Sequence, residues 1–155
     1  MLKEKNSIRA IKPKVIKFSK RLLKKECDTV FSMYIRHIRD KDKWCITCWN
    51  FDRKMDNWHF QVRQHMATRY SEMNCAKQCC YCNDEFQGEQ VKFWRKIDEI
   101  YGEWTAEALE MLANKPYKME QSEYLDIYNR YYNLIKDLPE TQKYIPTKKY
   151  LNATN

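Results

Sequence analysis

The chain has 155 residues, which is enough for one domain with a real core but short for two. Its mean hydropathy is −0.87 and 32% of its residues are charged, yet 14% are aromatic, which excludes a largely disordered chain. The net charge is +8, and only two glycines and four prolines are present, too few for a turn-rich β-sandwich or barrel.

The charge is unevenly distributed along the chain. Residues 1–25 hold ten basic groups and one acidic group, whereas residues 83–140 hold seven basic and thirteen acidic groups. We expect residues 1–14, interrupted by Pro13, to form a flexible basic arm, and residues 141–155 to form a frayed tail. Such an arm favours a polyanionic partner, and the alternative is a tail that only keeps the protein soluble.

The cysteine pattern and the absence of long apolar runs indicate the cellular compartment in which we expect the protein. No run near the N-terminus is long enough for a signal peptide or a membrane span, so we expect a cytoplasmic protein without a membrane partner. Seven cysteines is an odd number, and two pairs have the C-x-x-C spacing. Together these features favour thiolates on a metal over disulfides.

Helical periodicity is present before the cysteine-rich middle of the chain and is then lost. Apolar spacing predicts one or two helices within residues 15–40, the second running from about Thr29 to Ile38 with Asp28 as its N-cap. From there to Asn83 we expect only short extended segments, namely residues 43–46 and 58–62.

Helical spacing returns after Asn83. One apolar stripe, from Val91 to Tyr101, ends at Gly102 in a C-cap position. A second helix is expected from Thr105 to Ala113, and a third, rich in tyrosine, is closed by Pro139. The aromatic residues at helical spacing are expected to belong to the core rather than to stack on bases: Trp94, Tyr101, Trp104, Tyr128 and Tyr131.

The two C-x-x-C pairs predict a structural zinc site. Cys45 and Cys48 form one pair, and Cys79 and Cys82 the other, so two knuckles supply a tetrahedral four-thiolate shell with Zn–S bonds of about 2.3 Å. Cys79 is preferred to Cys80 because it keeps the two-residue spacer, and the alternative is four buried reduced cysteines. The other thiols are expected to pack or to lie at the surface: Cys27, Cys75 and Cys80.

Polar residues between the knuckles are the candidates for chemistry. His59 lies between Trp58 and Phe60, where a lone histidine is more often packed or exposed than functional. Asn74 precedes the second pair of cysteines and Asn83 follows it directly, so the three polar residues share one segment with the zinc ligands. His65 is expected to be a surface or DNA-facing residue, and His37 a solvated one.

The order of these residues resembles a known class of nuclease. His59, Asn74 and Asn83, with the cysteine pairs, resemble the HNH class of ββα-metal nucleases in its HNN form. More narrowly, "CITC", "WHF" and "TRYSEMNCAKQCCYCN" resemble the NinG/Rap family of phage recombination nucleases. That family has Gly-His-Phe/Tyr, Arg-Tyr/Phe and N-x-x-x-Q-C-x-x-C-N in the same order, and the resemblance covers roughly residues 27–113.

The resemblance implies an α+β, mostly helical fold with a small zinc-clamped ββα-metal core. Residues 15–140 would form a single HNH-type nuclease domain, with the core at 43–90 and C-terminal helices at 90–138. It also implies a metal-dependent DNA endonuclease acting on branched recombination intermediates, such as D-loops or Holliday junctions, in the host cytoplasm. A homodimer would suit symmetric cutting, with the tyrosine-rich C-terminal helix as its candidate interface.

Residue roles follow from the same resemblance. His59 would be the general base, Asn74 would orient the loop that carries it, and Asn83 would bind a catalytic Mg²⁺ or Mn²⁺, with Asp56 as a possible further ligand. The expected DNA contacts are Arg63, Arg69, Lys12, Lys14 and Lys17.

The sequence departs from the family in two places. Trp58 stands where the family has glycine, so its bulk would crowd the site, and Gly88-Glu89 stands where the family has Gly-Asn. The tryptophan in place of glycine supports an alternative, a non-catalytic zinc module that binds nucleic acid as a regulator or scaffold.

Overall fold

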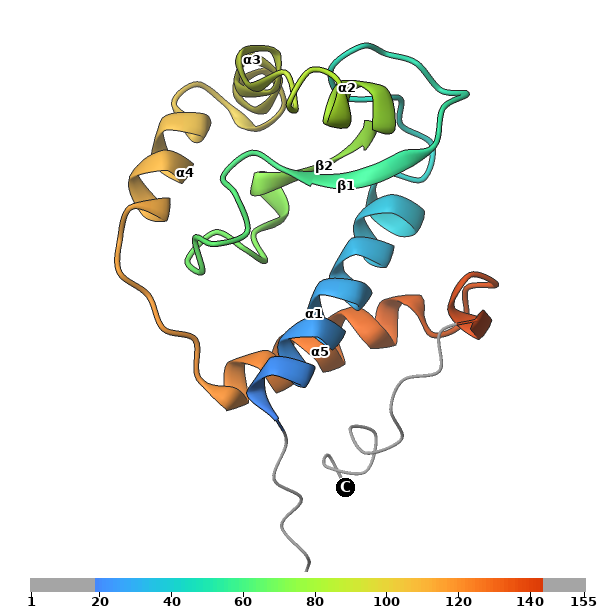
Figure 1. Ribbon diagram of the computed structural model, residues 1–155, viewed down its shortest axis with the longest axis vertical. Coiled ribbons are helices and arrows are strands. Elements are labelled where there is room, and N and C mark those ends of the chain that lie inside the picture. Colours follow the sequence, from blue (N-terminus) through green and yellow to red (C-terminus); the bar gives the residue numbers. More distant parts are fainter. Residues whose placement is uncertain (1–18, 144–155) are drawn as a thin grey trace, which may run out of the picture.

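The computed structural model describes residues 19–143, and it is a small mixed α/β structure, mostly helical, with one two-stranded sheet (Figure 1). The helices are α1 (Lys20–Tyr34), α2 (Cys80–Asp84), α3 (Gln90–Tyr101), α4 (Thr105–Ala113) and α5 (Gln121–Ile135). The strands are β1 (Met55–His59) and β2 (Cys75–Cys79), and short helical turns lie at Ile35–Arg39, Glu72–Asn74 and Thr141–Lys143.

The sheet and the short helix after it follow the order that the resemblance implies. β1 and β2 are antiparallel, with Met55 opposite Cys79 and His59 opposite Cys75, and α2 begins at the next residue. The extended segment predicted at 58–62 overlaps β1 at only two residues, and residues 43–46 form no strand. β2 was not predicted, because it contains two cysteines, a glutamine and a lysine rather than β-branched residues.

The prediction of a second N-terminal helix capped by Asp28 is wrong. α1 runs unbroken through Asp28 and continues into the π-helical turn at Ile35–Arg39. Asp28 lies in the interior of this helix and its carboxylate binds Arg69, which is 41 residues away along the chain. The polar residue therefore marks a tertiary ion pair and not a helix start.

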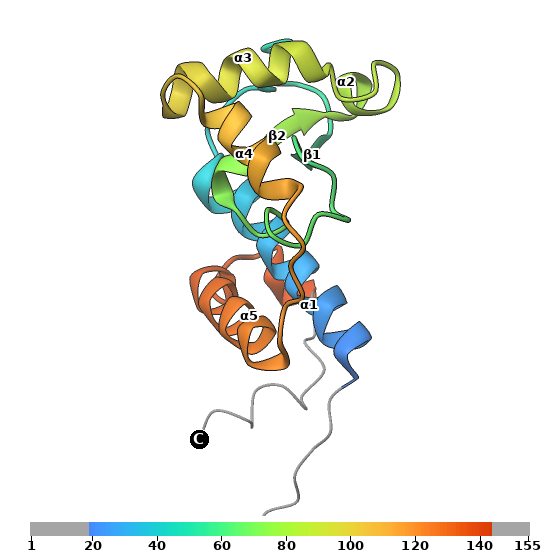
Figure 2. The same ribbon diagram turned by 90° about the vertical axis from the view of Figure 1, so that its left-hand side faces the viewer.

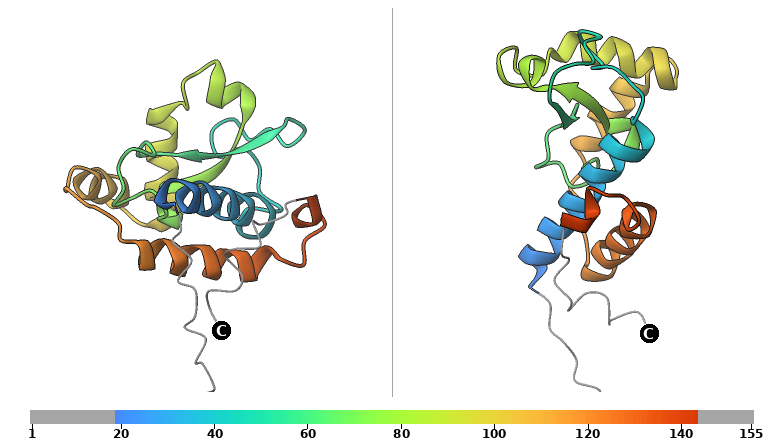
Figure 3. Two further views of the ribbon diagram at one scale, coloured as in Figure 1. Left: turned by 60° about the horizontal axis from the view of Figure 1, so that its bottom comes forward. Right: turned by 90° about the vertical axis from the view of Figure 1, so that its right-hand side faces the viewer.

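Two apolar clusters support the fold. One lies between α1 and α5, which run side by side, and includes Phe31, Tyr128 and Ile135 (Figures 1 and 3). The other lies between the sheet and helices α3 and α4, and includes Phe60 and Phe93. Figure 2 shows α3 and the sheet at one end of the molecule and α5 at the other, with α1 reaching from α5 towards the sheet.

Two of the five aromatic residues predicted for the core are buried. Tyr128 and Tyr131 are buried, as is Tyr124, so these tyrosines pack inside the chain and are not free to form the interface suggested for a dimer. Trp94, Tyr101 and Trp104 are exposed instead. In α3 the buried face is formed by Phe93 and Ile97, one turn apart, and the stripe that includes Val91, Trp94 and Tyr101 faces outward. Of the predicted stripe, Val91, Trp94, Ile97 and Tyr101, only Ile97 is buried, and Phe93 completes the buried face.

The ends of the chain are only partly described. Thr141 is buried and its Oγ1 donates a hydrogen bond of 2.6 Å to the Ile135 carbonyl, so the first three residues of the predicted frayed tail form an ordered turn. The predicted basic arm at 1–14 and the candidate DNA contacts Lys12, Lys14 and Lys17 lie outside the described residues. Within residues 19–143, no helix is both long and apolar enough to cross a membrane.

Candidate functional site

The four predicted zinc ligands lie together. The Sγ atoms of Cys45, Cys48, Cys79 and Cys82 are all within 4.8 Å of one another, and those of Cys48 and Cys79 are 3.6 Å apart. Tetrahedral zinc with bonds of about 2.3 Å places its sulfur ligands about 3.8 Å apart, so the cluster has the size and the soft donor set that zinc requires. This four-cysteine cluster can hold a structural metal such as zinc.

Backbone hydrogen bonds shape the two knuckles. The Cys45 N–H donates to the Asn50 carbonyl and the Cys45 carbonyl accepts from the Trp49 N–H, both at 3.0 Å, which folds residues 45–50 into a compact loop. Cys79 ends β2 and caps α2, because its Sγ accepts a hydrogen bond from the Cys82 N–H. The end of the sheet thus fixes the second pair of ligands.

The thiols of the cluster differ in acidity. Burial raises the pKa of Cys45, but hydrogen bonds from backbone amides and from Thr47 outweigh burial and bring it to about 6. Burial raises the pKa of Cys82 to about 12. A bound dication would deprotonate such thiols, since coordination favours the thiolate.

The remaining cysteines behave as expected. Cys27 and Cys75 are buried, Cys80 is half-buried, and none of the cysteines forms a disulfide in the described part of the chain. The Cys27 thiol donates to the Tyr124 carbonyl at 3.0 Å, which ties α1 to α5. The choice of Cys79 over Cys80 as a member of the cluster is supported.

His59, at the end of β1, is held in one tautomer. Its Nε2 lies 3.0 Å from the Arg69 carbonyl oxygen, and because a carbonyl only accepts, Nε2 must carry the proton. Burial, reinforced by the charges of Arg63 and Arg69, lowers the pKa of His59 to about 4. The imidazole is therefore neutral at pH 7, with a lone pair on Nδ1.

A cavity of about 360 Å³ opens beside this histidine. Its lining includes His59, Asn57 and the basic side chains of Lys24, Arg63 and Arg69. A smaller cavity of about 30 Å³ adjoins the same histidine and is also lined by Asn57 and Arg63. The arrangement places a neutral base next to cationic groups in a space that is partly closed to solvent.

Asn57 is a candidate that the sequence analysis missed. It lies two residues before His59, so both side chains lie on the same face of β1. Its Oδ1 is buried and has no hydrogen-bond partner within residues 19–143. The small cavity beside it has room for a single water, which is the group that normally satisfies such an atom. Alternation along the strand was the signal that could have identified it.

Asn74 is buried, with an exposed fraction of 0%, and it organises the loop after β1. Its Oδ1 accepts from the Gln61 N–H at 2.7 Å, and its Nδ2 donates to the carbonyls of Gln61 and Thr68 at 2.9 and 3.1 Å. These bonds fix the loop, and the role of Asn74 in orienting it for catalysis stays a prediction. The same loop carries Arg69, whose carbonyl fixes the tautomer of His59.

Arg69 forms an internal ion pair and not the free phosphate clamp that was expected. Its guanidinium binds both carboxylate oxygens of Asp28, at 2.8 and 2.6 Å, and it also donates to the Arg63 carbonyl. Only 7% of the residue is exposed. Arg63, which is exposed at the cavity, remains the candidate for a phosphate contact.

The two expected ligands of a catalytic cation do not gather around His59. Asp56 lies on the opposite face of β1, since strand side chains alternate. Asn83 lies in α2, lines neither cavity beside His59 and forms no side-chain hydrogen bond within the described residues. In that part of the chain, the four cysteines form the one cluster of His, Cys, Asp or Glu with metal-binding geometry.

Trp58 contacts Gly88 and also contributes to the lining of the cavity beside His59. Its indole lies against Gly88, where an added Cβ would come within 2.4 Å of Nε1. Gly88 also has φ of +84°, a left-handed conformation that favours glycine. A side chain there is therefore disfavoured both by the backbone conformation and by overlap with the indole. The ring also joins the apolar cluster under α3, and the expected crowding of the site by Trp58 stays a prediction.

The other two histidines, His65 and His37, contact groups outside the His59 cavity. Nδ1 of His65 lies 2.9 Å from the Ala113 carbonyl, which ties the loop after β1 to the end of α4. His65 is half-buried there, and its expected role as a surface or DNA-facing residue stays a prediction. His37 is partly exposed, as expected, with Nδ1 at 3.7 Å from Glu140.

Comparison with known proteins identifies one matching family model. No curated protein and no solved structure matches the chain. A family model described as the bacteriophage lambda NinG protein matches residues 2–141, which is most of the chain. The match includes both cysteine pairs and the segment with His59, Asn74 and Asn83. The chain therefore belongs to the bacteriophage lambda NinG family.

Proposed function

We propose that this NinG family protein is a DNA endonuclease of the HNH type, with a structural zinc and with His59 as its general base. The observation that carries the proposal is the state of His59. Its Nε2 proton is committed to the Arg69 carbonyl, so the lone pair of Nδ1 is left for a proton from water. The neighbouring cavity is lined by cationic side chains that suit a phosphodiester.

The proposed step is hydrolysis by an activated water. A water oxygen attacks the phosphorus while Nδ1 of His59 takes the water proton, and the bond from phosphorus to the 3′ oxygen breaks. The products are a 5′-phosphate and a 3′-hydroxyl, which takes its proton from solvent. Asn57 Oδ1, buried and unpartnered beside the one-water cavity, is suited to orient that water.

The catalytic cation is a separate part of the proposal. A divalent ion with Asn83 as a ligand follows from the resemblance, but Asp56 faces away and the described residues do not assemble a hard-cation site beside His59. The nicking assay below, run with and without each ion, measures the requirement for Mg²⁺ or Mn²⁺.

The substrate follows from the family resemblance alone. Branched recombination intermediates, D-loops or Holliday junctions in the host cytoplasm, are proposed on that basis, since nothing in the described residues encodes junction geometry. A homodimer stays part of the proposal, but its interface must differ from the buried tyrosines of α5.

A nicking assay tests the activity. Supercoiled plasmid is incubated with wild type, His59→Ala and His37→Ala, each with Mg²⁺, with Mn²⁺ and without added divalent ions. Nicking by wild type and His37→Ala that drops by about a hundredfold or more in His59→Ala is expected, since a general base contributes about 10² to 10⁴ to the rate. Wild type that nicks under no condition, or His59→Ala that nicks equally well, would refute the proposal.

A second candidate function is a non-catalytic zinc module that binds nucleic acid. The specific observation in its favour is that Trp58, which replaces the glycine of the family pattern, lines the His59 cavity, together with the position of Asp56 on the face away from His59. Both functions share the zinc and the DNA partner. DNA binding without nicking in every metal condition would favour the module.

A further inference from the structure

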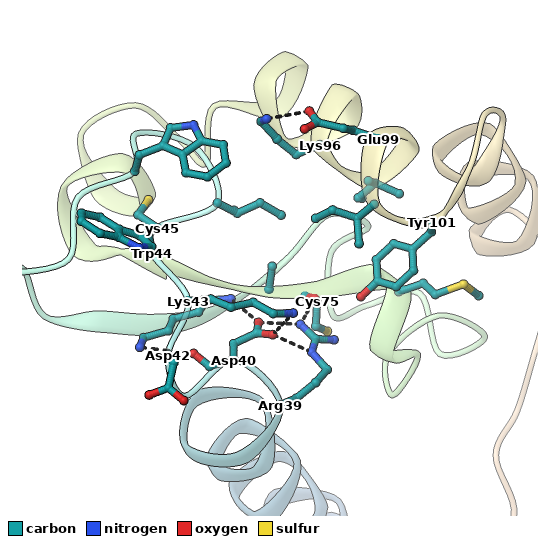
Figure 4. Close-up of a pocket in the computed structure, with 17 residues that line it drawn as sticks. Arg39, Asp40, Asp42, Lys43, Trp44, Cys45, Cys75, Lys96, Glu99 and Tyr101 are labelled. Carbon is teal, nitrogen blue, oxygen red and sulfur yellow. Dashed lines mark hydrogen bonds and ion pairs between the residues drawn. The ribbon is translucent and has the colours of Figure 1, made fainter.

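A second cavity, of about 350 Å³, lies away from His59, between the first zinc knuckle, β2 and α3. In Figure 4 α3, with Lys96 and Glu99, forms one wall, and Arg39 and Lys43 lie opposite. Trp44 lies at one end and Tyr101 at the other. The volume suits a small planar group, since ligand pockets begin at roughly 300 Å³.

Aromatic side chains stand at this cavity without being buried. Trp44 and Trp49, which line it, are 55% and 57% exposed, and neighbouring Phe51 is 50% exposed. Trp44 and Phe51 rings pack with their centroids 5.5 Å apart. Single exposed apolar residues need no explanation, but several aromatics gathered at one cavity indicate a binding surface. The Tyr101 hydroxyl adds a polar group without a hydrogen-bond partner among the described residues.

Basic side chains are interleaved with these rings. Lys96 Nζ lies 4.5 Å from the centre of the Trp49 ring, and Lys77 Nζ lies 5.6 Å from that of Phe51. Of the acidic groups at the cavity, Asp40 is paired with Arg39 and Lys43, and Glu99 with Lys96. Asp42 forms no ion pair in the described part of the chain, and the basic side chains in the lining outnumber the acidic ones by four to three.

We propose that this cavity receives an unpaired base of single-stranded DNA, stacked on Trp44 or Trp49, while the lysines contact the adjoining phosphates. Exposed rings alternating with cations are the composition that binds single strands, because every base offers a face to stack on. The inference deepens the proposed function by naming the part of the DNA that is bound, and it rests on that function only for the choice of DNA as partner.

The zinc cluster would give this surface its rigidity. Trp44 immediately precedes Cys45 and Trp49 immediately follows Cys48, so each ring is attached next to a member of the cluster. Rings on a fixed loop lose little conformational freedom when a base stacks on them, which favours binding. A structural metal would thereby serve recognition without touching DNA.

Binding of a fluorescent single strand of about 20 thymidines tests the proposal in buffer without added divalent ions, and the strand is checked for cleavage after each measurement. Trp44→Ala and Trp49→Ala should each weaken binding by about tenfold. Trp104→Ala removes another exposed tryptophan, at the turn between α3 and α4, and should bind as wild type does. Equal affinities for all four proteins, or equal losses in all three variants, would overturn the proposal.

A second measurement locates the base without relying on substitution. A strand carrying 5-iododeoxyuridine, irradiated on the wild-type protein, should crosslink to Trp44, Trp49 or Tyr101. Crosslinks confined to other residues would overturn the proposal. The wild-type protein separates the two proposals, because strand binding and plasmid nicking are measured independently. If wild type binds through the tryptophans but never nicks plasmid, the single-strand proposal is supported and the proposed nuclease activity is refuted.

Discussion

His59 is held neutral by its surroundings, and this has a consequence for stability. Its pKa in the folded state is about 4, against 6.5 in an ordinary environment, because it is buried next to Arg63 and Arg69. Between these two values the unfolded chain binds a proton that the folded protein does not. Stability contributed by the neutral ring is therefore complete above pH 6.5 and is lost as the pH falls towards 4.

The first prediction concerns that pH range. Wild type should lose on the order of 3 kcal/mol of unfolding free energy between pH 6.5 and 4 through His59, a shift of two to three pKa units. His59→Gln, which keeps a donor for the Arg69 carbonyl, should lack this component. Urea unfolding of both proteins across the range measures the difference, and loss of zinc in acid is common to both. Parallel pH curves would contradict the assignment of the buried neutral ring.

The second prediction concerns Trp58 and Gly88. Gly88→Ala should destabilise the fold by about 2–4 kcal/mol, from a left-handed backbone and from overlap with the indole. In a Trp58→Ala background the overlap is gone, and the same substitution should cost at least about 1 kcal/mol less. Unfolding free energies of the two single variants and the double variant provide the cycle. Simple additivity would show that the two residues do not constrain each other.

At the level of single residues, the sequence predicts groups of residues that lie close together along the chain, and it misses partners that are far apart. The four cysteines of the cluster were identified because two residues separate the members of each pair. The internal role of Arg69 was missed because its partner, Asp28, is 41 residues distant and lies in what appeared to be a helix cap. Asn57 was missed because its importance comes from the strand face it shares with His59 and not from a motif.

At the level of elements, the segment between the strands is fixed from several sides. Asn74 binds the backbone at Gln61 and Thr68, and the Asp28–Arg69 pair ties the same segment to α1. The cysteine cluster joins the end of β2 and the start of α2 to the first knuckle. A metal at the cluster would thus connect segments that have little regular structure of their own.

The third prediction tests that connection. The purified protein should contain about one zinc per chain, as a four-cysteine site binds one ion. Cys45→Ser should lose the metal and either unfold or aggregate, because metal binding contributes directly to folding. Cys80→Ser, which changes a half-buried thiol outside the cluster, is the matched control and should retain both. A folded wild-type protein free of metal would contradict the site.

Helices were easier to predict than strands in this chain. The α4 helix matches the predicted Thr105–Ala113, and α3 ends before Gly102, since caps and periodicity are local signals. The prediction overlapped β1 only in part and missed β2. Neither strand, MDNWH or CAKQC, contains a β-branched residue, so β propensity gave little signal for them. Pairing between segments about 20 residues apart is set by tertiary contacts.

At the scale of the whole molecule, the described residues place two candidate DNA-contacting features on one small scaffold. The cavity beside His59 offers a proton acceptor and cationic side chains. The cavity lined by Trp44 and Trp49 offers aromatic rings and lysines. Each is anchored by an element of the sheet, β1 for the first and β2 for the second. Family membership connects the chain to a phage protein, while the nuclease assignment depends on what His59 does.

Cleavage of a labelled four-way junction tests that assignment most directly. Wild type and His59→Ala, matched for zinc content and folding, are compared on the junction and on linear duplex of the same arm sequence, with Mg²⁺ or Mn²⁺. We predict that wild type cuts the junction faster than the duplex and leaves 5′-phosphate ends, and that His59→Ala binds the junction but cuts at least about a hundredfold more slowly. Junction binding without cleavage by wild type, or equal cleavage by both proteins, would contradict the account.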